Sequence, residues 1–277
     1  MMMVTMTMTV GMCSVQKKVF VGGHGRTLRK SAGGLNRLAT ATFRPLRPVS
    51  CLPPADWRTT AKPITNSKYP AKEHCSNCGL CDTYFVHHVK EACAFIAPGD
   101  DLSALEVATH GRSRDLDSDD ELLFGVTEAM MNAKIVPSVP GAQWTGIVTS
   151  IAVGMLSHGH VDAVVCVQSD ADDRFTPRPF VARTVDDIMA ARGVKPVLSP
   201  NLEVLATVEA LDVRNLLFIG VGCQVRAIRA VQPYLNVDNL YVLGTNCTDN
   251  GTREGLDKFL RLAPEAPAGE VVGYGGR

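Results

Sequence analysis

The stretch NLLFIGVGCQVRAIRAVQPYLNVDNLYVLGTNC, residues 215–247, decides the fold. It opens with a short apolar run at 215–220, continues through a helix-like segment at 224–235, and closes with a second apolar run at 239–244. Apolar runs of this length are typical of strands buried on both faces, and a helix between two of them predicts that the strands are parallel. We therefore expect a strand–helix–strand unit here.

The same alternation extends to both sides of this unit. Upstream lie a helix-like segment at 146–159, an apolar strand at 161–169 and helix-like segments at 185–192 and 202–211; another helix-like segment follows at 252–263. Strands that alternate with helices predict an α/β fold with a parallel sheet covered on both faces. We expect this core at 141–262, after a linker and surface segment at 101–140. The stretch DRFTPRPFVAR, 173–183, is either an exposed loop or an anion-binding loop.

Two cysteines follow strands of this core. Ligands of open parallel sheets bind at the carboxyl ends of the strands, and the segments 168–179, 220–224 and 244–251 fall there. If their strands are adjacent, Cys223 and Cys247 lie at one edge of the sheet, where they could share a ligand. The alternative is that each is a small buried apolar residue, as most cysteines are. Cys166, inside a strand, is expected in the core.

A cysteine motif precedes the core. The run CSNCGLCD places Cys75, Cys78 and Cys81 on one short loop, and Cys93 follows twelve residues later. This spacing is typical of a [4Fe–4S] site, although the ferredoxin run has its last cysteine nearer and followed by proline. Zinc sites with four cysteines usually use two separate Cys-x2-Cys pairs, so zinc fits poorly; disulfides or free thiols are the third alternative. We interpret 61–100 as an iron–sulfur segment.

Other candidate residues are less specific. His87 and His88 lie between the third and fourth motif cysteines and are either proton donors to a substrate or solvated residues of a short helix. The runs GAQWTGIVTS, 141–150, and LSPN, 198–201, precede helices, where their polar residues either bind an anion or cap the helix. No dinucleotide-binding fingerprint or P-loop follows a strand, so NAD in a Rossmann site is not supported.

Composition limits the function classes. The chain has 277 residues, 45% of them hydrophobic, and a formal net charge of zero, which argues against nucleic acid or an anionic membrane as a main partner. The longest apolar run, 146–156, is far shorter than the ~20 residues that cross a bilayer, so we expect a soluble protein. Any association with a membrane would come through other proteins. Nine cysteines with iron–sulfur spacing indicate a reducing compartment.

The N-terminal part differs in kind from the rest. It contains no acidic residue before Asp56 and carries eight basic residues among Thr, Ser, Gly and Ala. An acid-free, Arg-bearing, hydroxylated N-terminus is typical of an organelle transit peptide, and the alternative is a disordered basic tail. We interpret 1–60 as this transit or disordered segment.

Several segments together resemble the coenzyme F420 hydrogenase/dehydrogenase beta-subunit family: EHCSNCGLCDTYFVHHVKEACAF, GAQWTGIVTSIA, VVCVQSDADDRFTPRPFVART, GVKPVLSPN, LLFIGVGCQVRAIR and YVLGTNCTDNGTREGLDKFL. The resemblance runs from His74 to Leu262. It implies a parallel-sheet flavin-binding core with an N-terminal iron–sulfur segment, FAD as cofactor, and reduced ferredoxin as electron donor.

The implied substrate is a chlorophyll-type pigment. The reaction is either reduction of a 7-hydroxymethyl group to methyl, in the conversion of chlorophyll b to chlorophyll a, or reduction of the 8-vinyl group of divinyl chlorophyllide. A protein that binds ferredoxin or pigment without reacting is the non-enzymatic alternative. The implied compartment is the chloroplast, which agrees with the N-terminal composition.

The resemblance also implies site residues. A [4Fe–4S] cluster would be held by Cys75, Cys78, Cys81 and Cys93, and part of a second cluster by Cys223 and Cys247. FAD would contact Gln143, Thr145, Gly146, Gln168, Ser169, Arg178, Ser199, Asn201 and Gly222. Reduction of a C–OH group also needs a proton on the departing hydroxyl, so a general acid is expected near the flavin, with His87, His88 and Asp170 as candidates.

Two further expectations follow from the resemblance. Members of the family continue beyond the position of Leu262, whereas this chain has a Pro/Ala-rich stretch at 263–277, which we interpret as an atypical truncated tail that leaves the second cluster incomplete. We also expect Cys78→Ser to abolish turnover supported by ferredoxin and to leave flavin binding largely intact.

Overall fold

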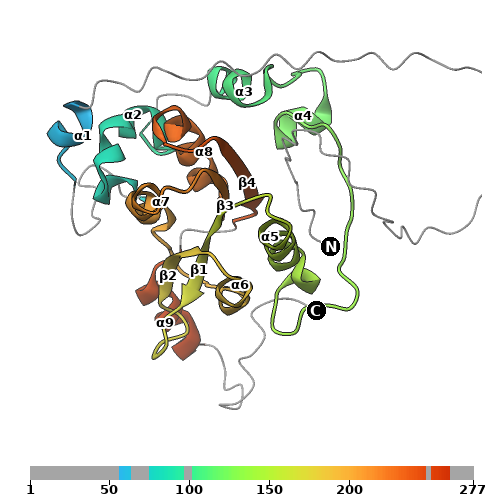
Figure 1. The fold of residues 1–277 in the computed structure, drawn as a ribbon. Helices are drawn as coiled ribbons and strands as arrows, with labels where there is room; N and C mark the ends of the chain where they lie inside the picture. The colour runs from blue at the N-terminus through green and yellow to red at the C-terminus, as the bar shows by residue number, and fades with distance from the viewer. Residues whose placement is uncertain (1–55, 64–74, 97–101, 248–250, 263–277) are drawn as a thin grey trace, which may run out of the picture. The chain divides into compact units, whose positions relative to one another are not determined.

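The fold is built on a mixed four-stranded sheet with the strand order β2-β1-β3-β4. A computed structural model describes residues 56–63, 75–96, 102–247 and 251–262 (Figure 1). Expectations for 1–55 and 263–277 lie outside the described residues. The strands are β1 (Ala163–Ser169), β2 (Pro177–Ala182), β3 (Asn215–Val221) and β4 (Asn239–Thr245). β1, β3 and β4 are parallel, as predicted from their apolar runs and the helix between β3 and β4.

The strand β2 is the main difference from the prediction. It forms within the stretch expected to be a loop and pairs antiparallel with β1, with Cys166 opposite Phe180 and Gln168 opposite Arg178. Two prolines, Pro177 and Pro179, lack the N–H that a strand donates, and an edge strand tolerates this because one side needs no partner. The sheet is therefore mixed rather than purely parallel.

Nine helices surround the sheet in the part of the chain that the structure describes. They are α1 (Asp56–Thr60), α2 (Val89–Ala92), α3 (Ser103–His110), α4 (Asp119–Phe124), α5 (Ile147–Ser157), α6 (Val185–Ala190), α7 (Leu205–Ala210), α8 (Gly222–Val231) and α9 (Arg253–Leu262). Short 3-10 turns lie at Leu80–Asp82, Tyr84–His88, Trp144–Gly146, Asn201–Val204 and Gln232–Tyr234. All five helices predicted for the core are present, within a few residues of the predicted bounds, and the third of them begins with a 3-10 turn.

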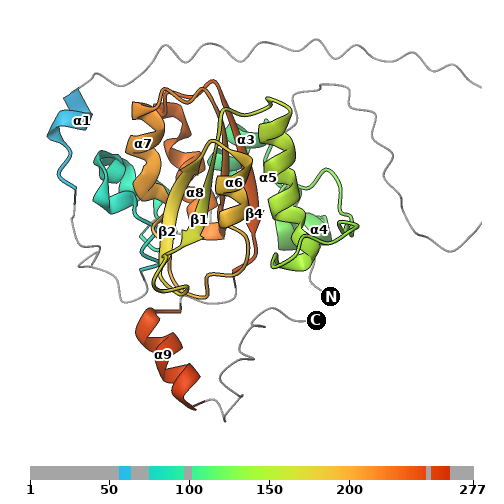
Figure 2. The same ribbon diagram turned by 60° about the horizontal axis from the view of Figure 1, so that its bottom comes forward.

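Successive strand residues point to opposite sides of the sheet, and here both sets are apolar, so helices cover both faces. Val165, Leu216 and Phe218 pack on one face, in a core shared with α7, α8 and the cysteine segment. Val164, Cys166 and Leu217 pack on the other face, in a core shared with α5 and α6 (Figures 1 and 2). The prediction that Cys166 belongs to the core is confirmed, since it is 4% exposed.

The helix α9 lies apart from these two layers, below β1 and β2 in Figure 2. Arg253 at its start pairs with Asp173 in the β1–β2 connection and with Asp257 one turn later. The guanidinium of Arg253 also lies 5.7 Å from the ring centroid of Phe175. These contacts attach α9 to the carboxyl edge of the sheet, where β1 ends.

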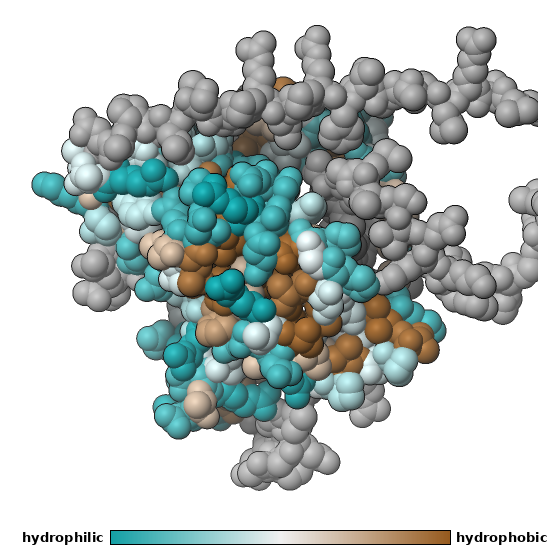
Figure 3. Space-filling view, viewed as in Figure 1, coloured by the Kyte–Doolittle hydropathy of each residue, from teal (hydrophilic) through white to brown (hydrophobic). Residues whose placement is uncertain are grey.

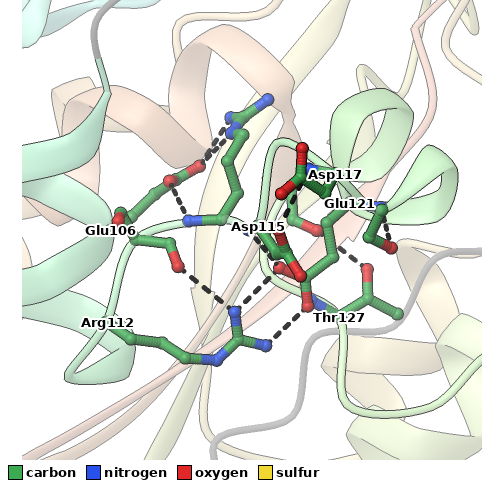
Figure 4. Close-up of polar contacts among 10 residues, drawn as sticks. Glu106, Arg112, Asp115, Asp117, Glu121 and Thr127 are labelled. Carbon is green, nitrogen blue, oxygen red and sulfur yellow. Dashed lines mark hydrogen bonds and ion pairs between the residues drawn. The ribbon is translucent and has the colours of Figure 1, made fainter.

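The segment at 101–140 is more ordered than its polar composition suggested. Two carboxylates join α3 to α4 and the following loop (Figure 4). Glu106 binds Arg114 through the side chain at 2.5 Å and through the backbone N–H at 2.9 Å. Glu121 accepts two bonds from Arg112, at 2.5 and 2.8 Å, and one each from the backbone N–H groups of Asp115 and Thr127.

The helix α1 lies within the stretch that we interpreted as a transit or disordered segment. Trp57 is only 5% exposed and contacts the rings of Tyr84, Phe85 and His88. Arg58 pairs with Glu209 of α7 at 2.8 Å. Trp57 and Arg58 of α1 therefore pack against the rest of the described fold.

The helix α5 carries no charged residue and reaches the surface. Apolar side chains gather over it in the face that Figure 3 shows, and Val148, Ile151 and Met155 are only partly buried. A helix that is apolar on most of its circumference is usually covered on most sides.

Among the described residues, none of the helices has the length and apolar character needed to cross a membrane.

Candidate functional site

The three clustered cysteines lie on a tight loop because two residues adopt left-handed backbone conformations. Asn77 has φ of 49° and Gly79 has φ of 87°, so the chain reverses twice between Cys75 and Cys81. The backbone N–H of Asn77 donates to the sulfur of Cys75 at 3.3 Å. The loop therefore turns its thiols toward one side, as a cluster site requires.

The fourth cysteine completes this arrangement. Cys93 follows α2, and its backbone N–H donates to the carbonyl of Val89 at 2.9 Å. One pocket is lined by all four cysteines, together with the apolar residues Val89 and Phe95. None of the four is in a disulfide, which removes that alternative for this structure.

Four cysteines that share one pocket supply the donor set of a [4Fe–4S] cluster, so the residues present fit that group. In the described ranges, no group of three or more His, Cys, Asp or Glu side chains is placed to hold a metal ion.

Burial dominates the acidity of these thiols. It raises the pKa of Cys78 to about 12, and neighbouring thiols, among them Cys223, act in the same direction. Burial also raises the pKa of Cys81 to about 11, with smaller contributions from Cys75 and Cys93. Cys78 and Cys81 must therefore release their protons when they bind a metal as thiolates.

The two strand-end cysteines lie at one edge of the sheet, as expected for adjacent parallel strands. Val221 pairs with Thr245, so Cys223 and Cys247 both follow the carboxyl ends of β3 and β4. Burial raises the pKa of Cys223, and Cys247 contributes in the same direction. The hydroxyl of Ser76, inside the cysteine motif, hydrogen-bonds Cys223. The two sets of cysteines are thus contiguous.

The loop at 199–203 carries two polar groups with unsatisfied hydrogen bonds. Ser199 Oγ and Asn201 Oδ1 are buried and have no hydrogen-bond partner among the described residues. The loop itself is fixed, because Gln224 donates to the Ser199 carbonyl at 2.8 Å and Asn201 donates to the Ile219 carbonyl at 3.2 Å. Buried polar atoms without partners are rare in proteins, so these two atoms fit contacts with a bound cofactor.

The turn before α5 has a different character. Trp144, Thr145 and Gly146 all have left-handed φ angles, of 52°, 60° and 89°. Thr145 Oγ1 accepts from the backbone N–H of Ile135 at 3.0 Å, and the N–H of Gly146 donates to the Gln143 carbonyl at 2.8 Å. Gln143, Thr145 and Gly146 thus shape this turn through contacts within the chain.

The remaining residues predicted to contact FAD lie at the carboxyl edge. Gln168 donates to the Asp187 carbonyl at 3.0 Å, and Ser169 is the last residue of β1. Arg178 lies 3.7 Å from Asp170, and its side chain is largely exposed. Gly222 is the first residue of α8, and a Cβ there would meet no atom within 4 Å. The Arg178–Asp170 ion pair is long and exposed, so it holds these side chains only weakly.

The candidate general acids are not brought together. Asp170 lies at the carboxyl edge, whereas His88 stacks on Tyr234 at 3.7 Å, beyond the end of α8 and toward the opposite edge. Burial lowers the pKa of His88, which keeps its ring neutral, and His87 beside it is exposed. His88 packs among aromatic rings, and its buried Nε2 has no hydrogen-bond partner among the described residues.

Sequence reasoning missed three residues that shape the site. Ser76 touches Cys223, Gln224 holds the loop at 199–203, and Gly79 lies against that loop. Ser76 and Gly79 stand inside the cysteine motif, so their position was the available signal. Gln224 could not have been found, because its role depends on a contact with a residue 25 positions away.

Two family models match this chain. The N-terminal model described as coenzyme F420 hydrogenase/dehydrogenase, beta subunit matches residues 130–206, and the C-terminal model of the same description matches 213–272. Both matches begin after the cysteine motif.

Similar proteins agree with these models. A protein of Oryza sativa subsp. japonica named 7-hydroxymethyl chlorophyll a reductase, chloroplastic, is 60% identical over 214 residues, which cover 76% of this chain and 45% of that protein. An uncharacterized protein of Nostoc sp. is 56% identical, over 76% of this chain and 52% of that protein. Coenzyme F420 hydrogenase subunit beta of Methanosarcina barkeri is 30% identical over 47% of each chain.

The chain spans about half the length of the curated relatives that it matches. Among solved structures, a chain of the F420-reducing [NiFe] hydrogenase complex from Methanosarcina barkeri is similar, with 27% identity, 44% coverage of each chain and a TM-score of 0.41.

Proposed function

The chain belongs to the coenzyme F420 hydrogenase/dehydrogenase beta-subunit family, and from this premise we propose that it acts in a ferredoxin-dependent iron–sulfur flavoprotein that reduces 7-hydroxymethyl chlorophyll a to chlorophyll a. The rice relative, 60% identical and named for this reaction, is the main support for the substrate. The same name supports the chloroplast as the compartment. The observation that carries the redox chemistry is the pocket lined by four free thiols.

The proposed roles follow from the contacts described above. Cys75, Cys78, Cys81 and Cys93 would hold a [4Fe–4S] cluster, and Ser199 and Asn201 would offer their unpaired oxygens to FAD. When bound, these groups would supply single-electron transfer and hydride chemistry. Cys223 and Cys247 would supply two of the four thiolates that a second cluster requires.

The reaction sets the requirements on the protein residues. Two electrons and two protons convert the C–OH group to CH3 and release water, so one proton must reach the departing hydroxyl. Among the three candidate acids, Asp170 is the one at the carboxyl edge, beside Arg178. On this placement we propose that Asp170 takes up a proton from solvent and passes it to the departing hydroxyl.

The experiment is a turnover assay on the whole chain, reconstituted without oxygen with iron, sulfide and FAD. Photoreduced ferredoxin is the donor, and 7-hydroxymethyl chlorophyll a and divinyl chlorophyllide are offered separately. Formation of chlorophyll a from the first substrate supports the proposal. Reduction of divinyl chlorophyllide alone would reassign the substrate, and no reduction of either by fully loaded protein would favour a pigment- or ferredoxin-binding protein that does not react.

A further inference from the structure

The cysteine loop and the loop at 199–203 are in direct backbone contact. The backbone N–H of Leu202, which is fully buried, donates to the Cys78 carbonyl at 2.9 Å. A Cβ placed on Gly79 would lie 2.7 Å from both the Pro200 carbonyl oxygen and the Glu203 nitrogen. Real Cβ atoms do not approach backbone atoms this closely, so only glycine permits the two loops to meet here.

The loop at 199–203 is therefore positioned from two sides. On the sheet side, Gln224 and the Ile219 carbonyl hold Ser199 and Asn201. On the other side, its support is the cysteine loop, through Cys78 and Gly79. The unpaired oxygens of Ser199 and Asn201 lie on this loop, one residue either side of Pro200. Their position thus depends on the conformation of the cysteine loop.

Filling the cysteine pocket changes the stability of that support. The free energy of metal binding is also free energy of ordering the ligand loop, because the ligands are not held in place in the unfolded chain. A loop whose cysteines are tied together by a cluster therefore keeps the Cys78 carbonyl and Gly79 in place more firmly than the same loop without a cluster. Any such effect on flavin binding must be reciprocal.

We propose that the cysteine pocket and the polar pair Ser199–Asn201 form one coupled binding unit, in which a bound iron–sulfur cluster strengthens FAD binding and bound FAD strengthens cluster retention, through the contact of Gly79 with Pro200 and Glu203. The inference rests on the proposed function. It differs from the sequence-based expectation that Cys78→Ser leaves flavin binding intact, since loss of the cluster weakens FAD binding in this account.

Gly111 provides a matched control for Gly79. Both glycines have left-handed φ angles, of 78° and 87°, so alanine strains the backbone similarly at either position. A Cβ on Gly111 would meet no atom within 4 Å, whereas a Cβ on Gly79 meets two backbone atoms. The difference between Gly79→Ala and Gly111→Ala therefore isolates the contact between the loops.

The test titrates FAD into the whole chain, with and without its iron–sulfur content, and follows the quenching of flavin fluorescence. We expect chelation of iron from the wild-type chain to raise the Kd for FAD by at least about fivefold, the lower end of ordinary coupling. Gly79→Ala is expected to raise this Kd similarly even at wild-type iron content, and chelation then adds little. Gly111→Ala is expected to match the wild type.

Three outcomes would overturn the inference. Equal FAD affinity of the wild-type chain with and without iron excludes the coupling, and this comparison needs no variant to fold. Equal effects of Gly79→Ala and Gly111→Ala exclude the contact as its route. If the wild-type chain binds neither iron nor FAD under any reconstitution, the proposed function is wrong as well. If it binds both without coupling, only this inference is wrong.

Discussion

Replacement of Trp57 by alanine tests whether α1 is part of the folded protein. The indole is 5% exposed and lies between 4.7 and 5.9 Å from five rings, those of Tyr84, Phe85, His87, His88 and Tyr234. A buried tryptophan removes about 200 Å² from water, which at about 25 cal/mol per Å² corresponds to ~5 kcal/mol. Measured losses for large aromatic residues in cores are about 3–5 kcal/mol.

The loss of unfolding free energy cannot exceed the free energy by which α1 packs on the core. Once Trp57 is replaced, a helix of only five residues detaches, and no further stability can then be lost through it. We therefore expect Trp57→Ala to lower the free energy of unfolding by about 3 kcal/mol, the lower end of that range. Trp57→Phe keeps an aromatic ring in the cluster and is the matched control, with an expected loss of about 1 kcal/mol.

The assay is urea unfolding of the iron-loaded chain, followed by far-UV circular dichroism. The chain has two tryptophans, and Trp144 is 39% exposed, so the buried Trp57 also gives a distinct fluorescence signal. A loss below about 1 kcal/mol for Trp57→Ala, or equal losses for both variants, would refute the packing of α1 into the core.

Four other predictions concern the fold and the site. Arg112 holds the pKa of Glu121 down at about 2, below its ordinary value of 4.5, so this carboxylate stabilises the fold above pH 4.5 and the contribution is lost as the pH falls toward 2. Glu121→Gln should therefore lower the melting temperature at pH 7 and reduce the change in melting temperature between pH 4.5 and pH 2, and an unchanged acid profile would contradict this. Phe218→Ala should cost about 3–5 kcal/mol in urea unfolding, because the ring is fully buried between the strand and α8, and a loss under about 1 kcal/mol would place it elsewhere. Asn201→Ala should weaken FAD binding about tenfold with unchanged iron content, as expected for one lost hydrogen bond to a cofactor, whereas equal Kd values would remove Asn201 from the site. Cys93→Ser should reduce iron and acid-labile sulfide to a small fraction of the wild-type content, and full retention would show that Cys93 is not a ligand.

The core could be predicted from the sequence because its signals are local. The apolar runs that became β1, β3 and β4 need no partner to be recognised, and the helix between β3 and β4 fixes their parallel direction. The same logic placed Cys223 and Cys247 at one edge. β2 was missed because its two prolines contradict a strand locally, and only its place at the edge of the sheet permits them.

The order in 101–140 was missed for another reason. Polar segments are read as solvated, but Glu106 and Glu121 are buried because Arg114 and Arg112 satisfy them. Such pairs are specified by partners that no periodic pattern reveals. The packing of Trp57 was missed likewise, because the bound of the N-terminal segment was set at residue 60 from composition, and composition does not show which aromatic rings Trp57 meets.

The candidate site, like the fold, could be predicted only in part from the sequence. The spacing of the four motif cysteines predicted their shared pocket, since three of them lie on one loop. Thr145 and Ser199 looked alike in sequence, as polar residues before helices. The structure separates them, because Thr145 Oγ1 is bonded to Ile135 and Ser199 Oγ has no partner among the described residues. Whether a polar group is already satisfied depends on tertiary contacts.

The most direct test of the account is the content of iron, acid-labile sulfide, zinc and flavin per chain, in protein purified without oxygen. The account predicts about four irons with matching sulfide, held by Cys75, Cys78, Cys81 and Cys93, together with bound FAD. Zinc without sulfide would contradict it, because the four thiols would then form a structural metal site that cannot pass electrons.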